Sequence, residues 1–519
     1  MAFFRYAGAV RRYILVGRVV TMTAQNQLFP NGAICIQDDS IVAVVPDLAQ
    51  IPAAFADASV VDTQGTIFPG LIELHNHLSY NFLPLWTVPK RYTNRNQWRT
   101  TEPSYDTFVA GPARLLGSNY DVDYPRSIAR FVECRSLMGG ITTTQGISAS
   151  SSAGSQYYQG LIRNVEAPAD PAFPKASGQT LDYAPADIAA KLVPALASNL
   201  PFFYHLSEGT DADARQRFLD LQFQPAKWAI TAHLITIHCT ALQAADFTRL
   251  SQDAGMVWSP LSNFLLYGQT SDIAQAKAQG MTIALGSDWS PSGSKNILGE
   301  LKIARIVSGN LGGLFTSEEL VRMVTSTPAK MLGWDGLVGT IQPGKKADLL
   351  IVDGVKGDPF DLLIDTTESD VLAVVIGGRP RYGRMGFLDF DAGRQEHVLV
   401  GGISYSLDLT EPGSDPLAGL SLATATTKLS YGLQNLPNLV PATPSATLMA
   451  LNMPREPAIS IDMELDPVPP GGLIEAFSLA AAPPLQPMTL PPITAVDDPG
   501  FIPAIKANPN LPAFLRNAL

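Results

Sequence analysis

The stretch that decides the fold runs from Phe68 to His77 and reads FPGLIELHNH. A Pro-Gly turn precedes the apolar run Leu71–Leu74, which predicts a short buried strand. Residues two apart in a strand point to the same face, so His75 and His77 should present both imidazoles where this strand ends. Two imidazoles on one face can share a metal ion, although H-x-H alone also fits two incidental polar residues.

Outward from this stretch, strand-like and helical segments alternate from about Arg126 to Ala329. Such alternation is typical of a parallel sheet. Counted from the strand that carries His75, the region spans roughly 260 residues, the usual size of a (β/α)8 barrel. We therefore predict an α/β fold with a TIM-like barrel. The predicted strands include Ile141–Thr144, Pro201–His205, Gly255–Trp258 and Met281–Gly286.

Strand-rich segments lie on both sides of the predicted barrel. Ile14–Val20 and Ile41–Val45 precede it, and Ala347–Val352 and Val371–Ile376 follow it. We expect them to pair into one small β-sandwich domain built from both flanks. The expected organisation is an N-terminal part of the β-domain, the barrel, a C-terminal part of the β-domain and a Pro-rich extension, at residues 1–68, 69–335, 336–390 and 391–519.

The C-terminal extension differs in composition from the rest of the chain. Of the 41 prolines, 17 lie between Pro437 and Pro512. Frequent proline interrupts long helices and central strands. We expect the segment to run extended over the barrel or a neighbouring subunit, with disorder as the alternative.

Composition limits the partners and the compartment. The net charge of −11 and the pI of about 5.1 argue against nucleic acid and anionic membranes as partners. Three scattered cysteines cannot form a disulfide framework, and the sequence shows neither a clear signal peptide nor a membrane span. We expect a cytoplasmic protein that binds a small molecule and forms a homo-oligomer, with a dimer favoured.

Four of the six histidines lie at the ends of predicted strands. The later motifs are His205-Leu206-Ser207-Glu208, His238 after an apolar run, and Gly286-Ser287-Asp288. Each alone has an ordinary structural interpretation, as a loop glutamate, a buried histidine or a helix cap. His233 is interpreted as structural because odd spacing points it away from His238, and His397 lies outside any motif.

Together these motifs are far more specific than any one of them. All lie at carboxyl ends of predicted strands, and barrel active sites occupy that end. We therefore predict a metal site formed by His75, His77, His205 and Asp288, with His238 as a possible further ligand.

The pattern resembles the amidohydrolase superfamily. Residues 68–77 resemble its first-strand signature, and the later motifs follow in its order. The H-x-x-E motif resembles the mononuclear branch that includes adenosine, cytosine and guanine deaminases and triazine hydrolases. Residues 259–263 (SPLSN) resemble the C-P-x-S-N turn of that branch, with Ser in place of Cys, and Gly339–Leu349 resembles the strand motif after the barrel. The resemblance covers roughly residues 13–385. Glu73, Asn76 and Trp289 depart from the usual pattern.

The resemblance implies a metal-dependent hydrolase that cleaves a C–N bond of a small cyclic substrate, by deamination or by amide or amidine hydrolysis. One divalent ion, zinc in preference to iron, would activate a water molecule. His238 would take the proton of the water or stabilise developing charge, and Asp288 would orient the water. Glu208 would carry a proton to the substrate nitrogen.

Two alternatives stay open. No lysine ends a strand between Thr144 and His205, so a bridging carbamylated lysine is not expected, but Glu166 could supply a carboxylate ligand. That would give a binuclear or glutamate-ligated amidohydrolase acting on linear amides or other substrates, with His238 as a fifth ligand. A catalytically silent scaffold on the same fold should have lost ligands that this chain keeps.

Aromatic and basic residues gather in the loop Leu83–Thr100, after the first barrel strand. They indicate contact with a planar or anionic substrate, or else a basic surface loop anchored by aromatic side chains. The predicted substrate-binding residues are Trp86, Tyr92, Asn263 and Trp289.

Overall fold

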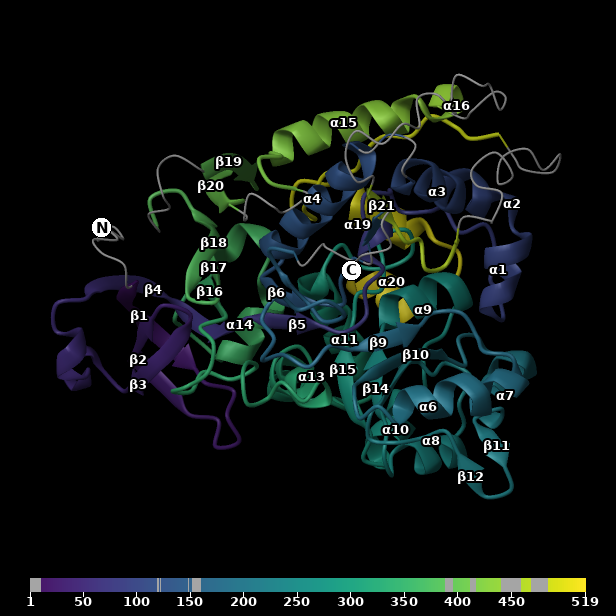
Figure 1. Cartoon of the computed structure of the whole chain (residues 1–519), viewed down its shortest axis with the longest axis horizontal. Coiled ribbons are helices and arrows are strands. Elements are labelled where there is room, and N and C mark those ends of the chain that lie inside the picture. The colour runs from purple at the N-terminus through teal and green to yellow at the C-terminus, as the bar shows by residue number, and fades with distance from the viewer. Residues whose placement is uncertain are drawn as a thin grey trace.

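The computed structural model describes residues 11–118, 121, 123–147, 149–151, 160–387, 395–410, 417–439, 459–467 and 484–519. Within these residues the centre of the molecule is a barrel of eight parallel strands (Figure 1). The strands are β5 (Leu71–Glu73), β6 (Ile141–Thr144), β8 (Arg163–Asn164), β9 (Ser177–Gln179), β10 (Phe202–Leu206), β13 (Leu234–His238), β14 (Gly255–Trp258) and β15 (Thr282–Leu285). The predicted α/β barrel is confirmed.

The barrel consists of two arcs joined at two seams. Strands β5, β6 and β8 form one arc, and β9, β10, β13, β14 and β15 form the other. At the first seam the amide of Ala176 donates to the carbonyl of Val165 at 2.8 Å. At the second, Asn76 and Asp288 form a parallel bridge that joins the last strand to the first.

A buried carboxyl group supports this second seam. Glu73 is fully buried and accepts hydrogen bonds from the backbone amide of Ser287 at 2.7 Å and from the Ser287 hydroxyl. Its other oxygen accepts from the side-chain amide of Asn76 at 2.9 Å. Glu73 and Asn76, which depart from the family pattern, therefore bond to each other and connect the first strand to the last.

Helices alternate with the strands and cover the outside of the barrel (Figure 1). The predicted helix Ala186–Ala197 is a composite of α5 (Pro185–Asp187), η5 (Ile188–Leu192) and α6 (Val193–Leu196). None of the helices described is long and apolar enough to cross a lipid bilayer. The other main helices are α1 (Arg95–Thr101), α3 (Gly111–Gly117), α4 (Asp123–Met138), α7 (Ala212–Leu219), α8 (Ala244–Leu250), α9 (Pro260–Tyr267), α10 (Ile273–Ala278), α11 (Ile297–Asn310), α12 (Ser317–Arg322), α13 (Ser326–Met331) and α14 (Pro359–Asp365).

One predicted helix is divided in the structure. The sequence predicts a helix over Ser317–Leu332, but α12 ends and α13 begins within this range. Pro328 has no N–H to donate to the carbonyl of Val324, so the hydrogen-bond ladder is interrupted there. That carbonyl accepts instead from the amide of Ile72 in β5, at 2.8 Å. The break therefore attaches the helix pair to the first barrel strand.

Both flanks of the barrel join in a single mixed sheet of nine strands, in the order β19-β20-β18-β17-β16-β4-β1-β2-β3 (Figure 1). The sheet continues directly into the barrel, because a single residue, Gly70, separates the end of β4 from the start of β5. A Cβ atom at the intervening Gly70 would lie 2.2 Å from the side chain of Thr142, so this junction requires glycine. We propose that the barrel domain extends over residues 69–335. The strands are β1 (Arg12–Val20), β2 (Leu28–Gln37), β3 (Ser40–Val45), β4 (Ser59–Pro69), β16 (Leu349–Asp353), β17 (Val371–Ile376), β18 (Arg379–Arg384), β19 (Gln395–Val400) and β20 (Ile403–Asp408).

The C-terminal extension begins with β19 and β20 of this sheet, and its later described parts pack on the barrel and contain regular structure. Helix α15 (Leu422–Gln434) lies along α4 (Figure 1) and ends before the first of the clustered prolines, Pro437. Strand β21 (Ile459–Ile461) pairs antiparallel with β7 (Ala149–Ser151). Two short helices, α19 (Phe501–Ala507) and α20 (Ala513–Ala518), follow. These segments are more regular than the extended run expected from the proline content.

Replacing Glu73 tests the second seam of the barrel. Glu73→Ala should lower the free energy of unfolding by about 3 kcal/mol, because it removes the acceptor of three buried donors, two on Ser287 and one on Asn76. Glu73→Gln keeps one acceptor oxygen and should fall between this variant and the wild type. Thermal unfolding followed by calorimetry measures the loss.

The matched control is Glu318→Ala, which removes a partly exposed carboxylate paired with Arg322 four residues later. That change should cost only about 0.5 kcal/mol. If Glu73→Ala melted at the same temperature as this control, the seam would not depend on the Glu73 carboxyl group.

Candidate active site

The predicted metal ligands converge at one end of the barrel. His75 and His77 follow β5, His205 lies in β10, His238 ends β13 and Asp288 follows β15. All five side chains are at least 97% buried. Parallel strands end on the same side of a barrel, and this common end brings together residues that are far apart in the sequence.

The ligand atoms face one another at short range. Nε2 of His75 lies 3.0 Å from Oδ1 of Asp288, and Nε2 of His77 lies 3.2 Å from Nε2 of His205. Nε2 of His77 is also 3.6 Å from Oδ1 of Asp288. The ligand atoms of His75, His77 and His205 lie within 4.8 Å of one another, as do those of His75, His238 and Asp288.

This donor set fits a divalent metal ion. Apart from its approach to Asp288, Nε2 of His75 has no hydrogen-bond partner among the residues that the structure describes. A buried polar atom without a partner is costly, and a metal ion at the centre of the cluster would satisfy it. Imidazole nitrogens with one carboxylate oxygen are the ligands that zinc and related ions prefer.

The electrostatics of His205, His238 and Asp288 favour the protonation states that a metal requires. Burial lowers the pKa of His205 and of His238 well below the usual value, and neighbouring imidazoles lower that of His205 further. Burial acts to raise the pKa of Asp288, but the charge and hydrogen bond of His75 outweigh it and hold that pKa low. Neutral imidazoles and an ionised carboxylate are the metal-binding forms of these groups.

Two of the site residues have a left-handed backbone. The φ angle is 66° at His238 and 65° at Asp288, a region that side chains other than glycine rarely adopt. Each such residue costs on the order of 1–3 kcal/mol and persists where the surroundings hold it. The geometry turns both side chains toward the centre of the barrel mouth at a cost in stability.

The protonation of the His238 ring follows from a chain of hydrogen bonds. The indole N–H of Trp258 can only donate, and it donates to the Thr270 hydroxyl at 2.8 Å. The Thr270 hydroxyl donates to Oδ1 of Asn263 at 3.1 Å, which leaves the Asn263 amide nitrogen to donate to Nδ1 of His238 at 3.0 Å. The proton of the neutral ring is therefore on Nε2, which lies 3.8 Å from Oε2 of Glu208.

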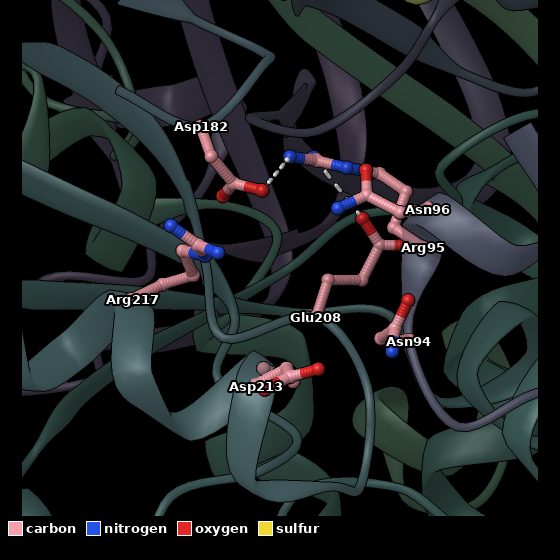
Figure 2. Close-up of a pocket in the computed structure, with 8 residues that line it drawn as sticks. Asn94, Arg95, Asn96, Asp182, Glu208, Asp213 and Arg217 are labelled. Carbon is pink, nitrogen blue, oxygen red and sulfur yellow. Dashed lines mark hydrogen bonds and ion pairs between the residues drawn. The ribbon is translucent and has the colours of Figure 1, made fainter. Parts of the chain in front are cut away.

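Glu208 is a buried carboxyl group with two donors. The Tyr267 hydroxyl donates to its Oε1 at 2.7 Å, and Arg95 donates to its Oε2 at 3.3 Å. Burial raises the pKa of Glu208 to about 7, against the opposing charge of Arg95. Figure 2 shows the Arg95 guanidinium group between Glu208 and Asp182, to which it also forms an ion pair at 3.1 Å.

Two cavities meet at Glu208. The inner cavity lies over the metal ligands and is small, about 10 Å³, which is room for about one water molecule. It is lined by His77, Trp98, His205, Glu208, His238, Asp288, Trp289 and Leu465. The outer pocket is about 140 Å³ (Figure 2) and is lined by Asn94, Arg95, Asn96, Asp182, Glu208, Asp213, Ala214 and Arg217. The Arg95–Glu208 pair lies where the two spaces adjoin.

The predicted substrate-binding residues are distributed between the cavity and the layer behind it. Trp289 lines the inner cavity. Asn263 contacts the site through His238, as described above. Trp86 and Tyr92 lie outside both linings and stack on each other with ring centroids 6.2 Å apart. From the same loop it is Trp98 that reaches the cavity.

Glu166, the alternative carboxylate ligand, lies outside the ligand clusters found among the described residues. Its Oε2 accepts a hydrogen bond from the amide of Gly146 at 2.9 Å. Burial raises its pKa to about 8. The geometry therefore gives Glu166 a backbone partner rather than a place among the imidazoles.

Two residues that contact the site come from a segment for which sequence analysis predicts no functional motif. Oε2 of Glu464 lies 2.8 Å from Nδ1 of His77, and Leu465 lines the inner cavity. Both belong to the C-terminal extension. Glu464 lies in the run IDMELDP, in which acidic residues alternate with apolar ones, but this local pattern does not indicate which distant residue Glu464 contacts.

Comparisons with known proteins agree with the fold and with the resemblance drawn from the sequence. Residues 195–381 match the family model described as the amidohydrolase family. The 5-methylthioadenosine/S-adenosylhomocysteine deaminase of Symbiobacterium thermophilum is 25% identical over an alignment of 413 residues, and the match covers 70% of this chain and 92% of that relative.

Two solved structures share the fold at low sequence identity. An adenosine deaminase from Xanthomonas campestris with bound zinc is 18% identical, with a TM-score of 0.54 over 73% of this chain and 94% of that chain. A mutant atrazine chlorohydrolase from Arthrobacter aurescens, complexed with zinc and atraton, is 20% identical, with a TM-score of 0.57 over 71% of this chain and 94% of that chain.

The resemblance drawn from the sequence is confirmed, because the family model, the relatives and the barrel all agree with it. Residues 195–381 of this chain are similar to the amidohydrolase family, and the protein is a hydrolase that acts on carbon–nitrogen bonds.

Proposed function

We propose that the protein is a zinc-dependent deaminase that removes an amino group from a small nitrogen-containing ring. The observation that carries this proposal is the position of Glu208. Its carboxyl group is buried beside the metal ligands, bonded to Tyr267 and close to His238. A carboxyl group with a pKa near 7 can both release and take up a proton at neutral pH.

The metal would be held by His75, His77, His205 and Asp288. Two of the structures with the same fold contain zinc, which favours zinc over iron. A bound divalent ion of this kind lowers the pKa of a water molecule toward neutrality and so supplies a hydroxide nucleophile. The separation of Glu166 from the ligand cluster supports one ion per chain rather than two.

The protonation of His238 decides its part in the reaction. Because Nδ1 accepts from Asn263, the nitrogen on the cavity side is an N–H donor and has no lone pair for a metal. We assign it to stabilise negative charge that develops on the substrate. Asp288 would orient the attacking water, and Glu208 would deliver a proton to the ring nitrogen beside the carbon under attack.

The substrate we propose is an amino-substituted purine or a related planar ring. The relative that matches over most of its length acts, by its name, on 5-methylthioadenosine and S-adenosylhomocysteine. Trp98 and Trp289 line the inner cavity, and aromatic side chains suit flat rings. A cavity of about 10 Å³ is too small for such a ring, so the residues that line it must move apart when the substrate binds. The outer pocket beyond Glu208 would receive a substituent of the ring.

We also propose a cytoplasmic location and a homodimer. The three cysteines are buried and form no disulfide bond within the described residues, as expected in a reducing compartment. The acidic net charge agrees with a small-molecule substrate rather than nucleic acid.

Metal content tests the proposed ligands. We expect one equivalent of zinc per chain after exhaustive dialysis, and its loss in His75→Ala and Asp288→Ala, because each removes a ligand. His233→Ala is the control, since His233 reaches β10 through its backbone carbonyl. Elemental analysis gives the answer. Two equivalents would favour the binuclear alternative, and none after zinc-replete expression would exclude both.

Glu208→Gln separates metal binding from proton transfer. The variant should retain zinc, because Glu208 is not among the proposed ligands, and should lose about 10²–10⁴-fold in turnover, because an amide cannot carry the proton. Glu166→Gln is the matched control, since it alters another buried carboxyl group of raised pKa. Turnover near the wild-type rate in Glu208→Gln would eliminate the proposed acid–base role.

A substrate screen tests the reaction class. We expect ammonia release from an amino-substituted purine nucleoside or a related ring among purines, pyrimidines, triazines, pterins and hydantoins. Phosphotriesters and lactones serve as controls, with mass change as the second readout. Phosphoesters would call for positive charge near the metal to balance the phosphoryl oxygens, whereas Trp98 and Trp289 line this cavity. Turnover confined to the controls would contradict the deaminase proposal and leave the metal site intact.

A further inference from the structure

We propose that Glu464 of the C-terminal extension is a positioning residue for the metal ligand His77, and that residues 459–467 complete the wall of the active site. The inference rests on the proposed metal site. It concerns a segment outside residues 195–381, which the family model matches. The relative from Symbiobacterium is matched over 92% of its length by 70% of this chain, so three-tenths of the chain has no counterpart in that match.

The contact between Glu464 and His77 sets the orientation of the ligand ring. A carboxylate oxygen can only accept, so Nδ1 of His77 donates its proton to Oε2 of Glu464 across 2.8 Å. The lone pair of the ring is then at Nε2, which faces His205 and Asp288. Carboxylates that bond the far nitrogen of a metal-bound histidine fix its tautomer and increase its basicity.

The segment that carries Glu464 is anchored by the two residues that follow it. Asp466 is fully buried and accepts from the hydroxyl groups of Tyr105 at 2.6 Å and Tyr80 at 3.0 Å. Arg99 donates to the carbonyl of Leu465 at 2.8 Å. All three donors lie in the region after β5, so the extension is bonded to the same part of the chain that carries His77.

The same segment covers the barrel mouth. Upstream, β21 pairs with β7, which follows the second barrel strand. Downstream, the side chain of Leu465 lines the inner cavity beside Trp98 and Trp289. The extension thus places a charged group on a metal ligand and an apolar group over the cavity. The extension excludes water from this side of the cavity. On the side of Arg95 and Glu208, the cavity still faces the outer pocket.

The experiment compares zinc affinity in the full-length protein and three variants by competition with a chromophoric chelator. Glu464→Ala should bind zinc about 10–100-fold more weakly, the usual effect of removing such a partner. Glu464→Gln should lie between Glu464→Ala and the wild type, because its amide oxygen still accepts from Nδ1 but carries no charge. Asp462→Asn is the matched control, since it neutralises an exposed carboxylate two residues earlier in the same segment.

Melting temperatures of the zinc-free proteins separate positioning from folding. Positioning predicts that Glu464→Gln loses zinc affinity while its zinc-free form melts like that of Asp462→Asn. If the wild type binds zinc and Glu464→Ala binds it within twofold, the inference is overturned. Should Glu464→Ala fail to fold, equal affinity in Glu464→Gln and Asp462→Asn overturns it instead. Failure of the wild type itself to bind zinc would refute the proposed metal site, a result distinct from either.

Discussion

The parallel bridge between Asn76 and Asp288 is the contact on which the active end of the barrel depends. His77 donates its backbone amide to the carbonyl of Asp288 at 2.6 Å, and Asp288 donates its own to the carbonyl of His75 at 3.0 Å. Three proposed metal ligands are therefore backbone neighbours across the seam. A shift of one residue in this register would turn their side chains to opposite faces. Glu73 bonds Ser287 and Asn76 on the two sides of the seam, so its carboxyl group supports both the fold and the site.

The mouth of the barrel combines features that each reduce stability. Several imidazoles are buried together, burial lowers the pKa of His205 and His238, and two site residues have left-handed backbones. These features persist because hydrogen bonds from the surrounding residues hold the site residues in place. The chain from Trp258 through Thr270 and Asn263 holds the ring of His238, for example. Local strain and burial of this kind are common where a fold supports chemistry rather than its own stability.

The extension shows how a segment with weak local preferences becomes ordered by contacts elsewhere. Helix α15 forms before the clustered prolines begin, whereas residues 459–467 are held by side chains of the barrel. The two tyrosine hydroxyls that bond Asp466 are themselves buried, and they balance the burial of its carboxylate. The order of this segment therefore depends on the barrel, and the closure of the cavity depends on this segment.

The sequence by itself determined the barrel and the place of the metal ligands. Short apolar or β-branched runs such as Ile141–Thr144 and Gly255–Trp258 mark strands through local composition. Parallel strands of a barrel end on one side, so the histidines at their ends lie near one another. Only the tertiary structure decided the remaining features. The carbonyl of Val324, left free where Pro328 breaks a helix, finds its donor in Ile72 of the first strand. Likewise, His77 and Glu464 are 387 positions apart, and no local pattern encodes a contact between residues so distant, because only the folded chain brings them together.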